Sequence, residues 1–126
     1  MKKIIETPNA PAPIGPYSQA VLYDNTLYTS GQIAIDPATG NLVSGDITAE
    51  TKQVMKNIGA VLEEAGMNFE DVLKTTIFIK DMTDCQKINE VYGSFFNEAT
   101  APARETVEVA RLPKDVHVEI SVLARK

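Results

Sequence analysis

The chain has 126 residues, and 12 Lys and Arg against 17 Asp and Glu give it a formal net charge of −5 at pH 7. Its 44% apolar and 23% charged residues are typical of a folded single domain, here residues 1–126, and argue against intrinsic disorder. The acidic balance argues against a broad nucleic-acid surface, because such surfaces depend on clustered Lys and Arg.

Several other classes of protein are disfavoured by what the chain lacks. The longest apolar run, Ala20–Tyr23, is far shorter than the roughly 20 residues of a membrane helix, and no apolar signal-peptide stretch follows Met1. We therefore expect a cytoplasmic protein. Cys85 and His117 are the single residues of their types, which excludes an intrachain disulfide and a cysteine zinc cluster. No glycine-rich phosphate-binding motif occurs, so we expect neither a metal nor a nucleotide cofactor.

The first third of the chain predicts a loop and a hairpin. Residues 8–16 contain four prolines, which fix backbone angles and indicate an extended, ordered loop. Ala20–Tyr23 and residues 27–30 are short apolar runs separated by Asp24, Asn25 and Thr26, a pattern typical of a β-hairpin.

The middle of the chain carries the clearest helical period. Asp46 or Thr48 can cap this helix, and Gly66 follows its last apolar residue. Its apolar stripe consists of Val54, Ile58, Val61, Leu62 and Ala65.

A strand over residues 72–80 follows, with Leu73, Thr75, Ile77 and Ile79 on one face. A second helix begins at Thr83 or Asp84, and its stripe is Ile88, Val91, Tyr92, Phe95 and Phe96. The closing strands, residues 104–110 and 116–123, are joined by a short connector and are predicted to pair antiparallel. The sum is an α+β domain with two helices on one face of a mixed sheet.

Polar side chains alternate with apolar ones in both closing strands. Arg104, Thr106 and Glu108 share one face of the first, and His117, Glu119 and Ser121 share one face of the second. Antiparallel pairing would bring both sets to the same side of the sheet. A solvated outer face gives the same pattern, so the alternation alone does not identify a site.

Short blocks spread along the chain nevertheless resemble the Rid (YjgF) family of reactive-intermediate deaminases. They cover essentially the whole chain in order and are residues 13–20 (PIGPYSQA), 30–33 (SGQI), 76–79 (TIFI), 89–92 (NEVY), 102–104 (PAR), 109–114 (VARLPK) and 118–120 (VEI).

The resemblance implies a chorismate-mutase-like fold that assembles as a homotrimer with sites in the clefts between subunits. The implied activity is hydrolysis of imines and their enamine tautomers, such as 2-iminopropanoate and 2-iminobutanoate, to 2-keto acids and ammonia, without a cofactor or a metal.

The resemblance also implies residue roles. Arg104 would bind the substrate carboxylate, the backbone of Thr106 would hold the imine nitrogen, and Glu119 with Tyr17 would handle the attacking water. Ser30, Gly31 and Asn89 would line or support the pocket. These roles fit the chemistry, because a guanidinium matches a carboxylate and a protonated imine carbon is already electrophilic.

The chain departs from the family pattern at three positions. Many relatives have Cys where this chain has Thr106, an aromatic residue where it has Ala101, and a second acid where it has Ser121. Two other functions stay open from the sequence: a regulatory or chaperone-like module that binds a small ligand without turnover, and a translation-inhibiting endoribonuclease.

Overall fold

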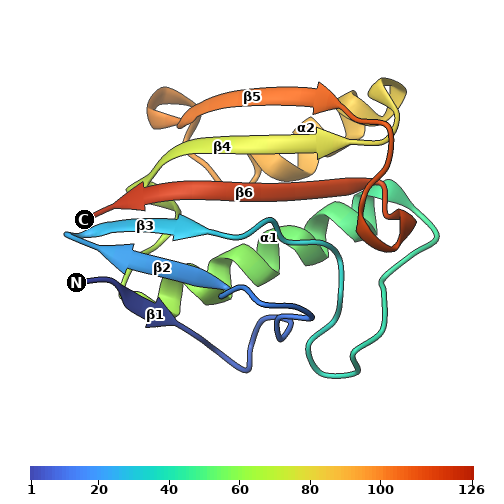
Figure 1. Ribbon diagram of the computed structural model, residues 1–126. Coiled ribbons are helices and arrows are strands. Elements are labelled where there is room, and N and C mark those ends of the chain that lie inside the picture. Colours follow the sequence, from blue (N-terminus) through green and yellow to red (C-terminus); the bar gives the residue numbers. More distant parts are fainter.

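One six-stranded mixed sheet, with two helices on one of its faces, makes up the computed structural model, which describes residues 1–126 (Figure 1). The strands follow one another across the sheet in the order β1-β2-β3-β6-β4-β5. Figure 1 shows α1 crossing behind β2 and β3, and α2 behind β4. The elements are β1 (Lys3–Ile5), β2 (Ala20–Tyr23), β3 (Thr26–Thr29), α1 (Ile47–Glu64), β4 (Val72–Ile79), α2 (Cys85–Gly93), β5 (Ala103–Glu108) and β6 (Val118–Arg125). The predicted α+β class is confirmed.

The two closing strands do not form the predicted hairpin. β5 pairs in parallel with β4 at the edge of the sheet, and β6 runs antiparallel between β4 and β3. Residues 109–117 connect β5 to β6 through a turn at Pro113–Asp115, and this length suffices to pass the end of β4. The prediction was wrong because a short connector indicates adjacency, whereas β4, α2 and β5 form a parallel crossover unit.

The first helix and the first hairpin follow the sequence pattern closely. Asp46 caps α1 by accepting a hydrogen bond from the Ala49 N–H at 2.8 Å, and Gly66, with φ of 74°, follows the helix end. The stripe from Val54 to Leu62 is buried against the sheet. Asp24 and Asn25 both have positive φ, as a tight hairpin turn requires.

Other predicted details differ. Leu73 is 51% exposed rather than inward-facing, because the register of β4 against β6 shifts between Val72 and Lys74. The second helix ends at Gly93, so Phe95 and Phe96 pack on the core from the segment after it. β1 was not predicted, since three residues are too few to show a period. None of the helices is both long and apolar enough to cross a membrane.

The proline-rich segment before β2 is an ordered loop that one buried side chain holds in place. Gln19 is 2% exposed, and its Nε2 amide lies 3.0, 3.2 and 2.9 Å from the carbonyl oxygens of Thr7, Ala10 and Pro11. Its Oε1 accepts from the Thr7 N–H at 2.7 Å. These bonds fix the loop that carries Tyr17.

Candidate functional site

The guanidinium of Arg104 lies beside α2 and is held on two sides. Its Nη1 donates to Asn89 Oδ1 at 2.6 Å, and its Cζ lies 5.2 Å from the centroid of the Tyr92 ring. No other hydrogen bond engages the guanidinium in this chain, so its remaining N–H groups are available to a carboxylate.

Glu119 projects from β6 on the face that carries no helices. Its neighbours Val118 and Ile120 are fully buried, which fixes the backbone, while its own side chain is half-buried. Burial raises the pKa of the Glu119 carboxyl above its ordinary value. A carboxylate with a raised pKa is better matched to accepting a proton near neutral pH than an ordinary one.

The segment after β3 packs directly against Glu119. Gln32 exchanges backbone hydrogen bonds with Ile120 at 2.8 and 3.1 Å, and the Ser30 N–H donates to the Gln19 carbonyl at 2.9 Å, so residues 30 and 31 are held between β3 and this bridge. A Cβ on Gly31 would lie 2.7 Å from Glu119 Cδ, so any larger residue there would displace the Glu119 carboxyl group from its position. Ser30 donates from Oγ to the Ser18 carbonyl and ties the segment to the loop before β2.

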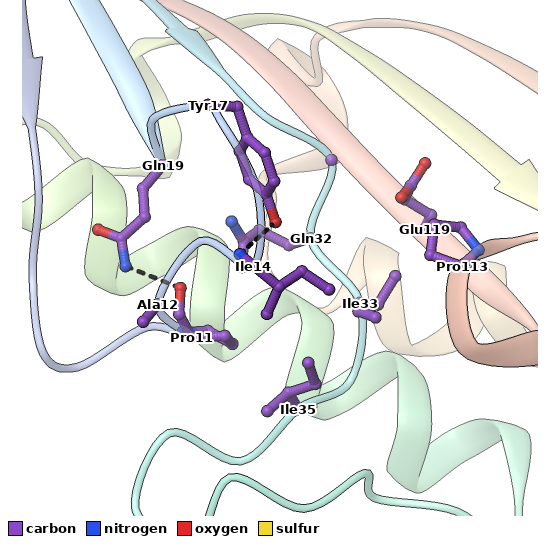
Figure 2. Close-up of a pocket in the computed structure, with 11 residues that line it drawn as sticks. Pro11, Ala12, Ile14, Tyr17, Gln19, Gln32, Ile33, Ile35, Pro113 and Glu119 are labelled. Atoms are coloured by element: carbon purple, nitrogen blue, oxygen red, sulfur yellow. Dashed lines mark hydrogen bonds between the residues drawn. The ribbon is translucent and has the colours of Figure 1, made fainter.

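Tyr17 and Glu119 line one small cavity of about 60 Å³. Figure 2 shows them on either side of the segment that leads to Ile33, with the Tyr17 hydroxyl directed at the Ile14 backbone. That hydroxyl accepts from the Ile14 N–H at 3.3 Å. The other lining residues are Pro11, Ala12, Ile14, Gln19, Gly31, Gln32, Ile33, Ile35 and Pro113. Among these residues only Tyr17, Gly31 and Glu119 are predicted site residues, since most of the others lie in loops and loop residues carry no periodic signal.

The expectation that Arg104, Thr106 and Glu119 share one face of the sheet is wrong. Ile77 of β4 lies opposite Thr106 of β5 and Ile120 of β6, and Ile77 and Ile120 are both buried beneath the helices. Arg104 and Thr106 therefore belong to the helix side. Phe78 lies opposite Glu119, which places the carboxylate on the open side. The predicted site residues thus form two groups in the chain: Arg104, Thr106 and Asn89 on one side, and Tyr17, Ser30, Gly31 and Glu119 on the other.

Thr106 lies on an edge strand, so one side of the β5 backbone has no strand partner within the chain. Its Oγ1 is buried and makes no hydrogen bond in the chain. An unpaired backbone edge next to Arg104 is the kind of group that could accept a hydrogen bond from a bound ligand.

No sequence pattern indicates the buried carboxylate that lies at the start of β6. Glu50 of α1 accepts from the backbone N–H groups of His117 and Val118 at 2.7 and 3.1 Å, and its Oε1 lies 2.9 Å from His117 Nδ1. These bonds fix the strand that carries Glu119. His117 is therefore engaged by a structural carboxylate rather than simply solvated.

The family model described as endoribonuclease L-PSP matches residues 7–126. The chain belongs to this family, the Rid (YjgF) family.

Relatives within the Rid family match along their whole length. The chain is 56% identical over 126 residues to a RutC family protein of Pyrococcus horikoshii, covering 100% of this chain and 99% of that protein. It is 50% identical over 126 residues to the 2-iminobutanoate/2-iminopropanoate deaminase of Salmonella typhimurium, covering 98% of each. The crystal structure of Escherichia coli TdcF with bound serine has a TM-score of 0.92 and 44% identity, and covers 98% of each chain. This likeness shows that the two chains share the same fold.

Proposed function

We propose that this protein hydrolyses 2-imino acids and their enamine tautomers, with 2-iminopropanoate and 2-iminobutanoate as substrates, to 2-keto acids and ammonia. The observation that carries the proposal is a guanidinium with free N–H groups together with a half-buried carboxylate of raised pKa. The Salmonella typhimurium relative, at 50% identity, is named for this activity.

We further propose that the site forms between subunits of a homotrimer. Arg104 and Glu119 lie on opposite sides of the sheet, so one subunit cannot present both to a small substrate. A second copy that places its open face near the first copy's β5 edge would bring the two groups together. The open face carries exposed apolar side chains, among them Tyr28 and Val107, which such a contact would cover.

In this arrangement each named residue has a distinct task. Arg104 receives the substrate carboxylate in a bidentate contact, and the Thr106 backbone carbonyl accepts from the imine N–H. Tyr17, Ser30 and Gly31 line the opposite wall beside Glu119. Binding at the carboxylate fixes where the neighbouring C=N bond lies, which supplies most of the orientation that the reaction needs.

The proposed reaction needs only water as co-reactant. Glu119 takes a proton from a water molecule as the water oxygen bonds to the carbon of the protonated imine, and the C=N electron pair moves to nitrogen to give a carbinolamine. The nitrogen then takes that proton from Glu119. The hydroxyl gives its proton to Glu119 as the C–N bond breaks, which forms the keto group and releases ammonia, and Glu119 passes the proton to water.

Substitution of the carboxylate anchor tests the proposal. In an assay that generates the imine from threonine with a dehydratase, we expect Arg104→Ala to lower kcat/KM about 100-fold or more, because a charged partner is lost. Arg104→Lys should remain well below the wild type, since Lys cannot form the planar fork. Arg125→Ala, which removes an exposed arginine of β6 whose guanidinium bonds to Asp24 and Thr26 at the β2–β3 turn, is the matched control.

Three other results would contradict the proposal. Wild-type turnover in Arg104→Ala would overturn it directly. Binding of a 2-keto acid at Arg104 with no faster ammonia release would favour a ligand-binding module. RNA cleavage that survives nuclease removal and Arg104→Ala would favour the endoribonuclease, for which a net charge of −5 supplies no general attraction.

A further inference from the structure

Beneath the guanidinium of Arg104 lies a buried pair of hydroxyl groups. The ring of Tyr92 faces Arg104 Cζ at 5.2 Å, and the Tyr92 hydroxyl is 2.7 Å from Thr75 Oγ1. Tyr92 is 6% exposed and Thr75 is 1% exposed. We call these two residues the Thr75–Tyr92 support. Neither residue was a candidate for function in the sequence.

The Thr75–Tyr92 support connects two residues that are neighbours in the sheet. Thr75 of β4 is the direct register partner of Arg104 in the parallel β4–β5 ladder. From Thr75 the contacts pass to the Tyr92 hydroxyl, through the ring, and back to the guanidinium of Arg104. Asn89, one turn earlier on α2, holds Nη1 from the side. The Arg104 guanidinium is thus restrained by the face of the Tyr92 ring and by the side-chain amide of Asn89.

We propose that Thr75 and Tyr92 are positioning residues, which hold the Arg104 guanidinium in the orientation that receives a substrate carboxylate. This inference rests on the function proposed above. An arginine that is ordered before binding loses less side-chain freedom when the ligand arrives, and a carboxylate requires both fork N–H groups to be aligned at once.

The hydroxyl bond fixes one end of the Tyr92 ring, which also packs against Phe96 with the ring centroids 4.8 Å apart. A buried phenol without a partner is unfavourable, so loss of Thr75 Oγ1 would favour rotation of Tyr92 toward another polar group or water. The negative face of the ring would then no longer lie against the guanidinium. The Tyr92 phenol is protonated at neutral pH, and burial raises its pKa further, so it can donate to Thr75 Oγ1 or accept from it.

Two substitutions remove the bond with little change in shape. We expect Thr75→Val and Tyr92→Phe each to raise the Kd for 2-ketobutanoate, measured by titration calorimetry, about fivefold, a factor typical of one lost hydrogen bond. KM for the imine should rise in parallel, with kcat within about twofold of the wild type, because carboxylate binding is common to ground state and transition state. Thr75→Ser should restore binding, and the double variant should be no worse than either single one.

Matched variants separate positioning from general destabilisation. Thr51→Val removes another buried threonine hydroxyl, which donates to the Ile47 carbonyl inside α1 at 2.7 Å. It should lower thermal stability without changing the Kd. Tyr23→Phe, at an exposed tyrosine of β2, should change neither.

The outcomes distinguish this inference from the proposed function. If Thr75→Val and Tyr92→Phe bind 2-ketobutanoate like the wild type while Arg104→Ala does not bind it, the positioning role is overturned and the proposed function stands. If Arg104→Ala binds it like the wild type, the proposed function fails, and the positioning role fails with it.

Discussion

Glu119 combines a rigid backbone with a half-buried carboxylate. Val118 and Ile120 anchor the strand in the core on both sides of it, and Gly31 lies against the carboxyl group. Strand alternation predicts that residue 119 points away from its two neighbours. Sequence alone does not show that Gly31, 88 positions earlier, provides the close contact that partly desolvates the carboxyl group.

The first residue-scale prediction concerns turnover by Glu119→Gln. We expect kcat to fall about 100-fold or more, because the amide cannot accept the proton of water. In the wild type, kcat/KM should fall as the pH drops through the raised pKa of Glu119, and the residual activity of the variant should lack this limb. A variant with the wild-type pH profile would assign the base to another group.

Stability provides a second readout for the same substitution. Because the folded state raises the pKa of Glu119, it binds the proton more tightly than the unfolded chain does, and the charged form at higher pH is disfavoured by burial. The wild type should therefore lose stability relative to Glu119→Gln as the pH rises from the ordinary glutamate pKa through the raised one. Thermal melts at pH 4 and pH 8 check the sign; a variant that is relatively less stable at pH 8 would contradict it.

At the scale of elements, local pattern predicted what each segment is but not which segments pair. The α1 stripe, its Asp46 cap and the hairpin of β2 and β3 are local features, and they were predicted from neighbouring residues. The partners of β5 and β6 depend on α2 carrying the chain back to start β5 parallel to β4. Since face assignment follows from pairing, the error in pairing placed Arg104 and Glu119 on one side.

At the scale of elements, the hydrogen bonds of Gln19 to the loop before β2 predict a large effect on the free energy of unfolding. Gln19→Leu keeps the volume but leaves four backbone groups, from Thr7, Ala10 and Pro11, without their buried partner. We expect a loss of about 3 kcal/mol in the free energy of unfolding. Urea titration measures it, with the exposed Gln86→Leu of α2 as control. A loss no greater than that of the control would mean that the loop is held by other contacts.

At the scale of the whole molecule, the two groups of site residues face different directions. The resemblance to the Rid family along the whole chain predicts sites between subunits, whereas the alternation of polar residues predicts a site on one face of the sheet. The register of β4 against β5 and β6 puts Arg104 and Glu119 on opposite faces of the sheet, which rules out a site on one face of a single chain. The same register is compatible with a site between subunits. No local property of the sequence carries that distinction, because it arises from the position of β4 between the two strands.

Mixed assemblies test the intersubunit site. Arg104→Ala and Glu119→Gln subunits are each expected to be inactive alone. After co-refolding at equal amounts, a cyclic trimer that takes Arg104 from one copy and Glu119 from the next would have about a quarter of its sites intact. Ammonia release should return to about that fraction of the wild-type rate. A mixture as inactive as its components would indicate that both residues act within one chain.

The opposite orientation of the two side chains also bears on how activity begins. In a newly made single subunit, a substrate bound at Arg104 would be out of reach of Glu119, and a substrate near Glu119 would lack the guanidinium that binds its carboxylate. Turnover would then start only when copies meet, so in dilute solution the rate would rise more steeply than in proportion to the protein concentration. Because Glu119 and Arg104 lie on opposite faces of the sheet, a single chain would be inactive until it assembles with other copies.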